Sequence, residues 1–250
     1  MPLSGTLDLT ARLADAPVMD SADADAWEIE GVELLNLSFE IDDRHMVDVL
    51  PPALHPVIPP TAYFTIARYP ESPVGAFTLA QVRVGCRAAA LPRGFLLRAY
   101  ADTQDACDAL RARWGYDCRR ADVRLRTFHD RVVGSVSDGG REILRASLLN
   151  PEPISGGDVQ YVANMNLAKL EGAPTLVQVD PEYRFQRADR GRPHLETFER
   201  AAWAAEDVDP VYPITATSVL CDTGFPKIRY VIDPLKPALV GTRKIADREK

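Results

Sequence analysis

The sequence predicts an α+β fold, in which a curved antiparallel β-sheet or an open β-barrel carries a few short helices. Three observations support this class. Strand-like runs dominate the chain, helical runs are few, and strands and helices do not alternate in the βαβ rhythm of a parallel sheet. With 250 residues, of which 46% are hydrophobic and 26% charged, the chain has the composition of a globular protein and enough length for a large core.

The chain changes character at about residue 26. Residues 1–25 are polar and rich in Ala and Asp, so we expect a loosely ordered N-terminal arm, followed by one domain over residues 26–250. The alternation from Trp27 to Val32 and the apolar run Leu34–Ile41 predict the first strand of this domain.

A short helix is expected next, over residues 42–50. The pair Asp42-Asp43 can cap it, and the proline pair at 51–52 ends it, because proline cannot continue a helix. Three strand-like runs follow, at Ala62–Arg68, Gly75–Cys86 and Gly94–Ala101.

The clearest helix of the chain covers Asp105–Trp114. Thr103 is a suitable N-cap, one apolar stripe runs along the segment, and Gly115 stops it. Alternating segments separated by short turns then predict an antiparallel meander at Val123–Thr127, Arg131–Val136 and Glu142–Leu149. The remaining strands are expected at Gln160–Leu170, Thr175–Gln186, Ile214–Cys221 and Lys227–Ile232.

Charge and residue usage exclude several classes of protein. The net charge of −7 argues against nucleic acid and anionic membranes as partners, and no apolar run is long enough to span a bilayer. No secretory signal and no CxxC pair is visible, so we expect a cytoplasmic protein with four reduced cysteines. The histidines lack metal-ligand spacing and no phosphate-binding glycine loop is present, so we expect no metal and no cofactor.

Three stretches in conserved order resemble the acetoacetate decarboxylase family. The first, residues 36–54, is a strand and a short helix ending in Leu-Pro-Pro-Ala-Leu. The second and most specific, residues 96–136, includes Trp-Gly-Tyr at 114–116 and Val-Val-Gly-Ser-Val at 132–136. The third is Asn-Met-Asn-Leu-Ala-Lys-Leu at 164–170. The likeness extends from about residue 27 to residue 233 and implies the open barrel of that family and a homo-oligomer.

The resemblance breaks at the residue that gives the family its chemistry. Family members have Gly-aromatic-Pro-Lys-Lys after the helix; the first lysine forms a Schiff base with the keto acid, and the second depresses its pKa, an effect for which this family is the usual illustration. Here the segment reads Gly-Tyr-Asp-Cys-Arg-Arg, so Cys118 stands at the position of the nucleophile and Arg119 at that of its partner. A thiol forms no imine, and a guanidinium stays protonated, so neither can replace the lysine.

Other positions of the family's site also differ. The resemblance places Glu40 where the family has a carboxylate-binding arginine, and Thr65 and Leu79 near its two glutamates. Tyr116 keeps its place in the motif and is expected to line the pocket, and Arg98 is a further candidate for binding an anionic group. These changes together indicate a remodelled pocket.

Each candidate catalytic residue has an alternative interpretation. Cys118 is either a thiol activated by the arginines beside it or a small buried side chain that fills the space of the lysine. Glu40 is either a buried acid/base group or an exposed strand residue. Gly-Phe-Pro-Lys at 224–227 matches the Gly-aromatic-Pro-Lys pattern of the family's nucleophile motif. We nevertheless interpret Lys227 as an exposed strand residue rather than a relocated nucleophile.

The sequence therefore predicts a lyase-like enzyme without Schiff-base chemistry. We expect acid/base catalysis on a small or medium oxo or enol substrate, of the lyase, dehydratase or cyclase type, as in specialised biosynthesis. Arg119 would hold an oxyanion, and Glu40 or Cys118 would move protons. Two alternatives stay open at this point: a catalytically silent relative that binds a small molecule or a partner, and a decarboxylase or aldolase that uses Lys227.

Overall fold

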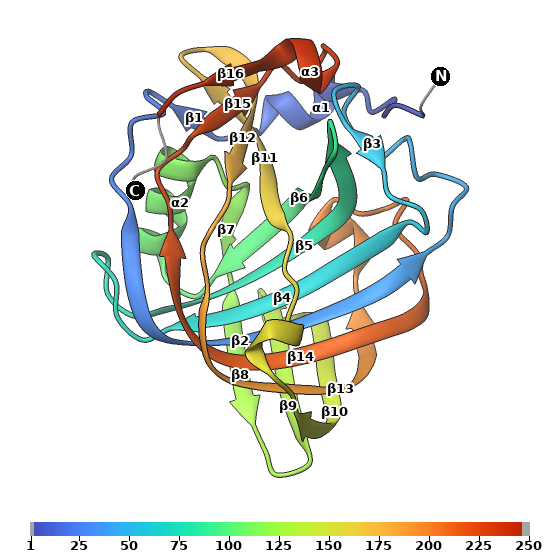
Figure 1. The fold of residues 1–250 in the computed structure, drawn as a ribbon, viewed down its shortest axis with the longest axis vertical. Helices are drawn as coiled ribbons and strands as arrows, with labels where there is room; N and C mark the ends of the chain where they lie inside the picture. Colours follow the sequence, from blue (N-terminus) through green and yellow to red (C-terminus); the bar gives the residue numbers. More distant parts are fainter. Residues whose placement is uncertain (1–2, 247–250) are drawn as a thin grey trace.

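A computed structural model describes residues 3–246 and consists mostly of β-strands (Figure 1). The strands form one mixed sheet with the order β16-β15-β12-β11-β6-β5-β4-β2-β14-β13-β10-β9-β8. In this order their bounds are Thr242–Lys244, Tyr230–Ile232, Ala173–Val179, Ala163–Leu170, Leu91–Ala101, Phe77–Ala88, Thr61–Tyr69, Trp27–Ile41, Pro210–Phe225, Arg184–Phe198, Arg141–Pro153, Arg131–Asp138 and Asp122–Thr127. The sheet confirms the expected fold class, with parallel pairs added where β11 joins β6 and β7 joins β6.

Short elements complete the fold at the edges of this sheet. The short strands β1 (Val18–Met19), β3 (His55–Pro56) and β7 (Cys118–Arg120) pair with β11, β5 and β6. The α-helices are α1 (Leu9–Ala14), α2 (Gln104–Trp114) and α3 (Ala238–Gly241), and 3-10 turns lie at Gly156–Asp158 and Arg200–Trp203.

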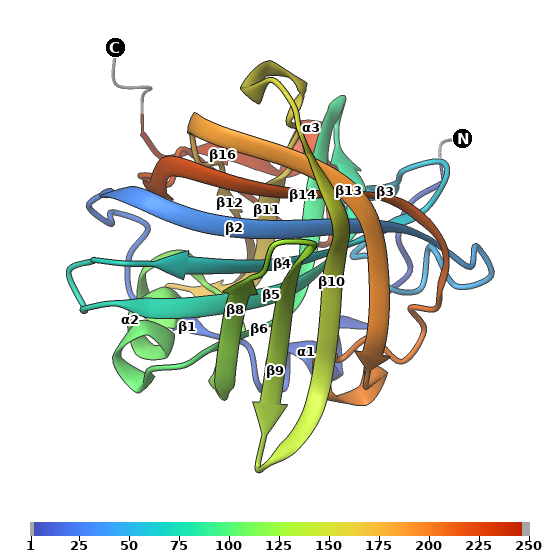
Figure 2. The ribbon, with the colours of Figure 1, turned by 90° about the horizontal axis from the view of Figure 1, so that it is seen from below.

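The sheet curls so that its two ends pass over opposite sides of its middle strands. Strands β11 and β12 lie across β4 and β5 in Figure 1, and β8 to β10 lie in front of the same strands in Figure 2. Because successive strand residues point to opposite faces, each side receives its own core. Leu35, Phe64 and Ile66 pack on the side of β8–β10, whereas Leu34 and Ala67 pack on the side of α2.

Helix α2 forms as the sequence predicts. The Thr103 hydroxyl accepts a hydrogen bond from the amide of Ala106, and Gly115 ends the helix with a φ of 64°, in the left-handed region that favours glycine. A Cβ atom at this glycine would meet the Cβ atom of Ala168 at 2.8 Å, so space as well as conformation requires glycine. The last helical residue, Trp114, is fully buried and donates from its indole nitrogen to the carbonyl of Pro226. The chain that leaves α2 toward β7 therefore has a fixed path.

Residues 42–50 do not form the expected helix. The segment is a series of turns closed by hydrogen bonds between residues three apart, such as Asp48 to His45 and Leu50 to Val47. The Asp42 carboxylate accepts from the amide of Arg44, which makes a local turn rather than a helix cap.

The bounds of two strands differ from those that the sequence predicts. The run expected at residues 175–186 is divided between β12 and β13 at Asp180-Pro181, and the strand expected from Lys227 begins only at Tyr230. Strand β13 was missed over most of its length, because one side faces solvent and its arginines and aspartates hide the alternation.

The N-terminal segment is packed rather than loosely ordered over the part that the structure describes, residues 3–25; Met1 and Pro2 lie outside it. Met19 is fully buried, Leu9 is nearly so, and β1 pairs in parallel with β11. Short polar linkers between these apolar residues gave the segment its disordered appearance in the sequence.

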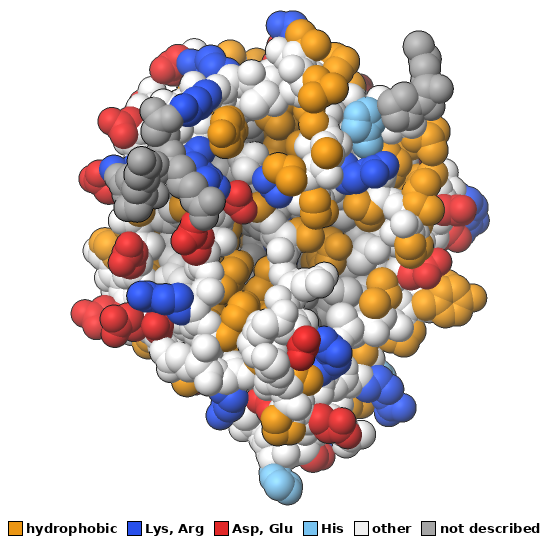
Figure 3. Space-filling model, in the orientation of Figure 1, with side chains coloured by type: hydrophobic (Ala, Val, Ile, Leu, Met, Phe, Trp, Pro, Cys, Tyr) orange, Lys and Arg blue, Asp and Glu red, His pale blue; other side chains and the backbone are white. Residues whose placement is uncertain are grey.

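The surface around α3 is apolar. Leu239 and Val240 of α3 are 86% and 76% exposed. Helix α3 lies at the top of Figure 1, and Figure 3 shows hydrophobic side chains in that part of the same face. An uncovered apolar surface of this kind is typical of a contact region between proteins. No helix among residues 3–246 has the length and apolar character needed to cross a membrane.

Candidate functional site

A row of directly paired residues crosses the middle of the sheet on the α2 side. Paired residues on neighbouring strands point to the same face, so the row brings side chains from β14, β2, β4, β5, β6 and β7 together. The row consists of Thr217, Asn36, Thr65, Gln81, Ala99 and Cys118. It contains four buried polar residues in succession and no lysine. This row is the floor of the candidate site.

Arg83 is the centre of the site and lies on the same face of β5, two residues after Gln81. Its side chain is almost completely buried. Its two terminal nitrogens donate to the carbonyl of Val162 at 2.8 Å, to Oδ1 of Asn164 at 2.7 Å and to the hydroxyl of Thr65 at 2.8 Å. All three partners are neutral, and Nε has no hydrogen-bond partner among residues 3–246. The site therefore holds a buried cation with a free donor and no carboxylate in contact.

Four tyrosines surround this cation. Burial lowers the pKa of Arg83, and the proximity of Tyr183, Tyr116, Tyr63 and Tyr161 acts in the opposite direction. The guanidinium carbon lies 5.7 Å from the ring centroid of Tyr63, the residue paired with Arg83 across the strands. Burial raises the pKa of Tyr183 to about 12 and raises those of Tyr116 and Tyr161 as well. These hydroxyl groups stay protonated at neutral pH and can donate hydrogen bonds.

Asn164 connects the cation to the motif that follows α2. Its Nδ2 donates to Oε1 of Gln81 at 2.7 Å and to the hydroxyl of Tyr116 at 3.1 Å, while its Oδ1 accepts from Arg83. Thr65 accepts from Arg83 and donates to Oδ1 of Asn36 at 2.7 Å. The side chains of the site are thus held in one hydrogen-bonded network, which we call the Arg83 network: Asn36, Thr65, Gln81, Arg83, Tyr116 and Asn164.

The structure brings only some of the residues expected from the sequence into this network. Tyr116 and Thr65 belong to it. Leu79 lies on the same face of β5 but is buried in the apolar core beside it. Cys118 lies in the row, yet its sulfur contacts that of Cys107 on α2 at 3.4 Å. The hydrogen bond between these thiols and burial raise the pKa of Cys118 well above its usual value, so the thiol is neutral and packed.

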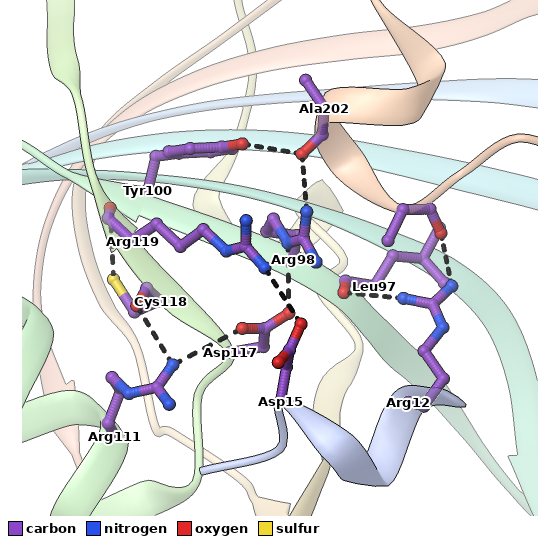
Figure 4. A network of polar contacts seen from close by, with 11 residues as sticks. Arg12, Asp15, Leu97, Arg98, Tyr100, Arg111, Asp117, Cys118, Arg119 and Ala202 are labelled. Carbon is purple, nitrogen blue, oxygen red and sulfur yellow. Dashed lines mark hydrogen bonds and ion pairs between the residues drawn. The ribbon is translucent and has the colours of Figure 1, made fainter. Parts of the chain in front are cut away.

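Glu40, Arg98 and Arg119 lie outside the network, contrary to the expectation of one shared pocket. Glu40 is four residues beyond Asn36, near the end of β2, where it pairs with Thr61. Arg98 and Arg119 belong to a separate group of charged residues on the face of β6 and β7 opposite to the row (Figure 4). We call this group, made of Arg12, Arg98, Arg111, Arg119, Asp15 and Asp117, the outer arginine network.

Sequence reasoning missed Asn36, Gln81, Arg83 and Asn164. A signal for them was present. Gln81 and Arg83 interrupt the apolar run Phe77–Cys86 at alternate positions, and Asn36 and Asn164 interrupt buried strands in the same way. A polar residue at an inward position of a buried strand requires a partner, so such residues are expected to meet.

A buried polar network centred on a guanidinium thus lies within an open, curved sheet of the α+β class. The family model of acetoacetate decarboxylase (ADC) matches residues 14–234, and the chain belongs to this family. No curated protein sequence matches the chain significantly.

Several solved structures have the same fold as this chain at low sequence identity. The acetoacetate decarboxylase from Legionella pneumophila subsp. pneumophila str. Philadelphia 1 is 19% identical, with a TM-score of 0.73 over 82% of this chain and 86% of that one. The enduracididine biosynthesis enzyme MppR, in complex with the condensation product of pyruvate and imidazole 4-carboxaldehyde, is 15% identical, with a TM-score of 0.66 over 84% and 90%. An acetoacetate decarboxylase-like enzyme from Sphingomonas wittichii RW1 is 16% identical, with a TM-score of 0.61 over 83% and 94%.

The described residues offer no metal site. Among residues 3–246, no group of three or more His, Cys, Asp or Glu side chains is arranged to hold an ion. The Arg83 network consists of amides, hydroxyls and one guanidinium, which are groups that recognise an anionic organic molecule rather than a cation.

Proposed function

We propose that this protein is a lyase-like enzyme that binds a small oxo acid or enol acid at Arg83 and acts on it by acid/base catalysis, without a Schiff base. The observation that carries this proposal is the buried guanidinium of Arg83, whose contacts are all neutral and whose Nε lacks a partner. A buried charge without a counter-charge costs several kcal/mol. An anionic ligand removes that cost, and a carboxylate or an enolate oxygen fits the free donor.

Tyr116 is the proposed proton donor. Its hydroxyl is held by Asn164, and burial raises its pKa, so it carries a proton at neutral pH. A neutral phenol near an enolate oxygen can stabilise that oxygen by a hydrogen bond or transfer a proton to it. Arg83 and Tyr116 thereby take the roles that the sequence alone suggested for Arg119 and for Glu40 or Cys118.

The position of the family's nucleophile supports chemistry without an imine. Cys118 occupies that position in the motif, and its thiol is buried against Cys107 with a raised pKa. A neutral thiol is a poor nucleophile, and its adduct with a ketone provides no electron sink. Lys227 lies in the connection between β14 and β15, outside the row of paired residues. MppR has been solved with pyruvate, so the fold accommodates a 2-oxo acid in that protein.

The proposal is tested by calorimetric titration of the protein with pyruvate, acetoacetate and methyl pyruvate. The carboxylates should bind at least about tenfold more tightly than the ester, because a hydrogen bond between charged groups contributes about 1.5–3 kcal/mol. In deuterated buffer, proton NMR should show accelerated exchange at C3 of bound pyruvate, the signature of enol formation.

The outcomes separate the candidate functions. Binding with accelerated exchange supports the enzyme. Binding without exchange or turnover supports the catalytically silent relative. Equal affinity for acid and ester would refute the role of Arg83 in both.

A further inference from the structure

Four residues of the outer arginine network, Asp15, Arg111, Asp117 and Arg119, line an open pocket of about 340 Å³ (Figure 4). The pocket is bounded by residues 14–16, which follow α1, and by Arg111, Asp117 and Arg119. Tyr116 and Asp117 are consecutive, yet the Tyr116 hydroxyl joins the Arg83 network and the Asp117 carboxylate joins the outer one. The two sites are therefore distinct and share a short segment of backbone.

Positive charge is in excess in the outer arginine network as a whole, whereas the pocket wall itself carries two arginines and two aspartates. The network has four guanidinium groups and two carboxylates, and Glu206 acts on Arg12 as a third acidic group, although the protein as a whole carries a net charge of −7. Asp117 is shared: it accepts from Nε of Arg98 at 3.1 Å and lies 3.5 Å from Nη1 of Arg111. Arg12 donates to the main-chain carbonyls of Leu97 and Ala204 rather than to a carboxylate. With Glu206 counted, the four arginines exceed the carboxylates around them by one.

Arg119 is the arginine most available to a ligand. Its only ion pair among residues 3–246 joins Nη2 to Oδ2 of Asp15 at 3.7 Å, longer than a good charged hydrogen bond. The side chains of Arg119 and Asp15 are 46% and 76% exposed, so solvent screens this pair and it contributes little. Arg111, also at the pocket wall, is partly exposed.

We propose that this pocket is a second ligand site, which binds a dianionic oxyanion group between Arg111 and Arg119 and displaces the Asp15 carboxylate. A phosphate group and a dicarboxylate share this chemistry, since both present several oxygens to guanidinium donors. Asp117 stays with Arg98 and Arg111 and holds both arginines in position. The site differs from the Arg83 network in taking its ligand at the surface.

The first test measures binding of inorganic phosphate, malonate and acetate to the whole protein by calorimetry at constant ionic strength. Dianions should bind at least about tenfold more tightly than acetate. The comparison of phosphate with malonate shows whether the site prefers a phosphate group or a dicarboxylate. Equal, weak binding of all three would mean that only general ionic attraction is present, and would overturn the proposal.

Two substitutions with opposite expected effects sharpen the test. Arg119→Ala should weaken binding of the dianion about tenfold or more, while Asp15→Asn should strengthen it about threefold, because a competing carboxylate is removed. Arg120→Ala is the matched control: this arginine is adjacent in β7 and exposed, but does not line the pocket, so its effect should stay within about twofold.

The pattern of results is decisive either way. Equal losses for Arg119→Ala and Arg120→Ala, or weaker binding by Asp15→Asn, would refute the site. Circular dichroism and thermal melting should show all three variants folded, since Arg119, Asp15 and Arg120 are at the surface. An Arg83→Met variant should bind phosphate normally, which separates this inference from the proposed function.

Discussion

Arg83→Met is expected to weaken binding of pyruvate by about 30-fold or more and to lower the Tm. Removing one partner from a buried, hydrogen-bonded charge pair costs about 2–5 kcal/mol of binding free energy. In the free protein, methionine would also leave the carbonyl of Val162, Oδ1 of Asn164 and the hydroxyl of Thr65 without their buried donor. Each buried group left unpaired costs about 1–3 kcal/mol. Removal of a buried charge without a counter-charge offsets part of this loss, so we expect a lowered Tm together with lost affinity.

Calorimetric titration and thermal melting measure the two effects of Arg83→Met on the same sample. Arg68→Met is the matched control, because Arg68 is on the neighbouring strand β4 and half-exposed, where it pairs with Glu33. The control should bind pyruvate like the wild-type protein. If Arg83→Met binds pyruvate as tightly as the wild-type protein does, Arg83 does not bind the ligand and the proposed site is wrong.

Asn164→Asp is expected to abolish pyruvate binding by placing a carboxylate inside the site. Oδ1 of Asn164 already lies 2.7 Å from a terminal nitrogen of Arg83, so a carboxylate there would neutralise the guanidinium. Gln81 and Tyr116 can turn their own donors toward the new group, since amides and hydroxyls both donate and accept. The affinity should fall about 30-fold or more, because the incoming anion would lose its counter-charge and meet a like charge.

The pH dependence of this variant gives a second readout. A carboxylate beside Arg83 has its pKa depressed in the folded protein, so any stability that it adds is present above the unfolded pKa of about 4 and is lost as the pH falls. Asn164→Ser is the neutral control and should lose no more than about tenfold in affinity. If Asn164→Asp binds pyruvate as well as Asn164→Ser does, the charge of Arg83 is not what the ligand recognises.

Local rules accounted for much of the fold. Helix α2 was predictable because Thr103 caps it and Gly115 stops it, both of which depend on residues near in sequence. The meander of β8, β9 and β10 was predictable for the same reason, with a Gly-Gly turn at 139–140. Strand β13 was not, since it is stabilised by its two neighbouring strands and shows little apolar alternation of its own.

The site depends on register, which sequence patterns do not specify across distant strands. Gln81 pairs with Thr65 and Thr65 with Asn36, whereas motif spacing had placed Leu79 and Glu40 near those positions. A shift of one residue turns a side chain to the other face of the sheet, and a shift of two moves it along the same face to different neighbours. Tyr116 joins the Arg83 network because its motif directly follows the fixed end of α2, whereas Arg119 lies on the opposite face of β7 from Cys118.

Borohydride trapping tests the central claim most directly. The protein is incubated with pyruvate or acetoacetate, reduced with borohydride, and weighed as an intact chain, while released carbon dioxide is followed. We expect an unchanged mass and no carbon dioxide from acetoacetate, because the motif position holds a buried neutral thiol and the row of paired residues holds no lysine. A reduced adduct on Lys227 or any other lysine would show that imine chemistry persists and would contradict the account.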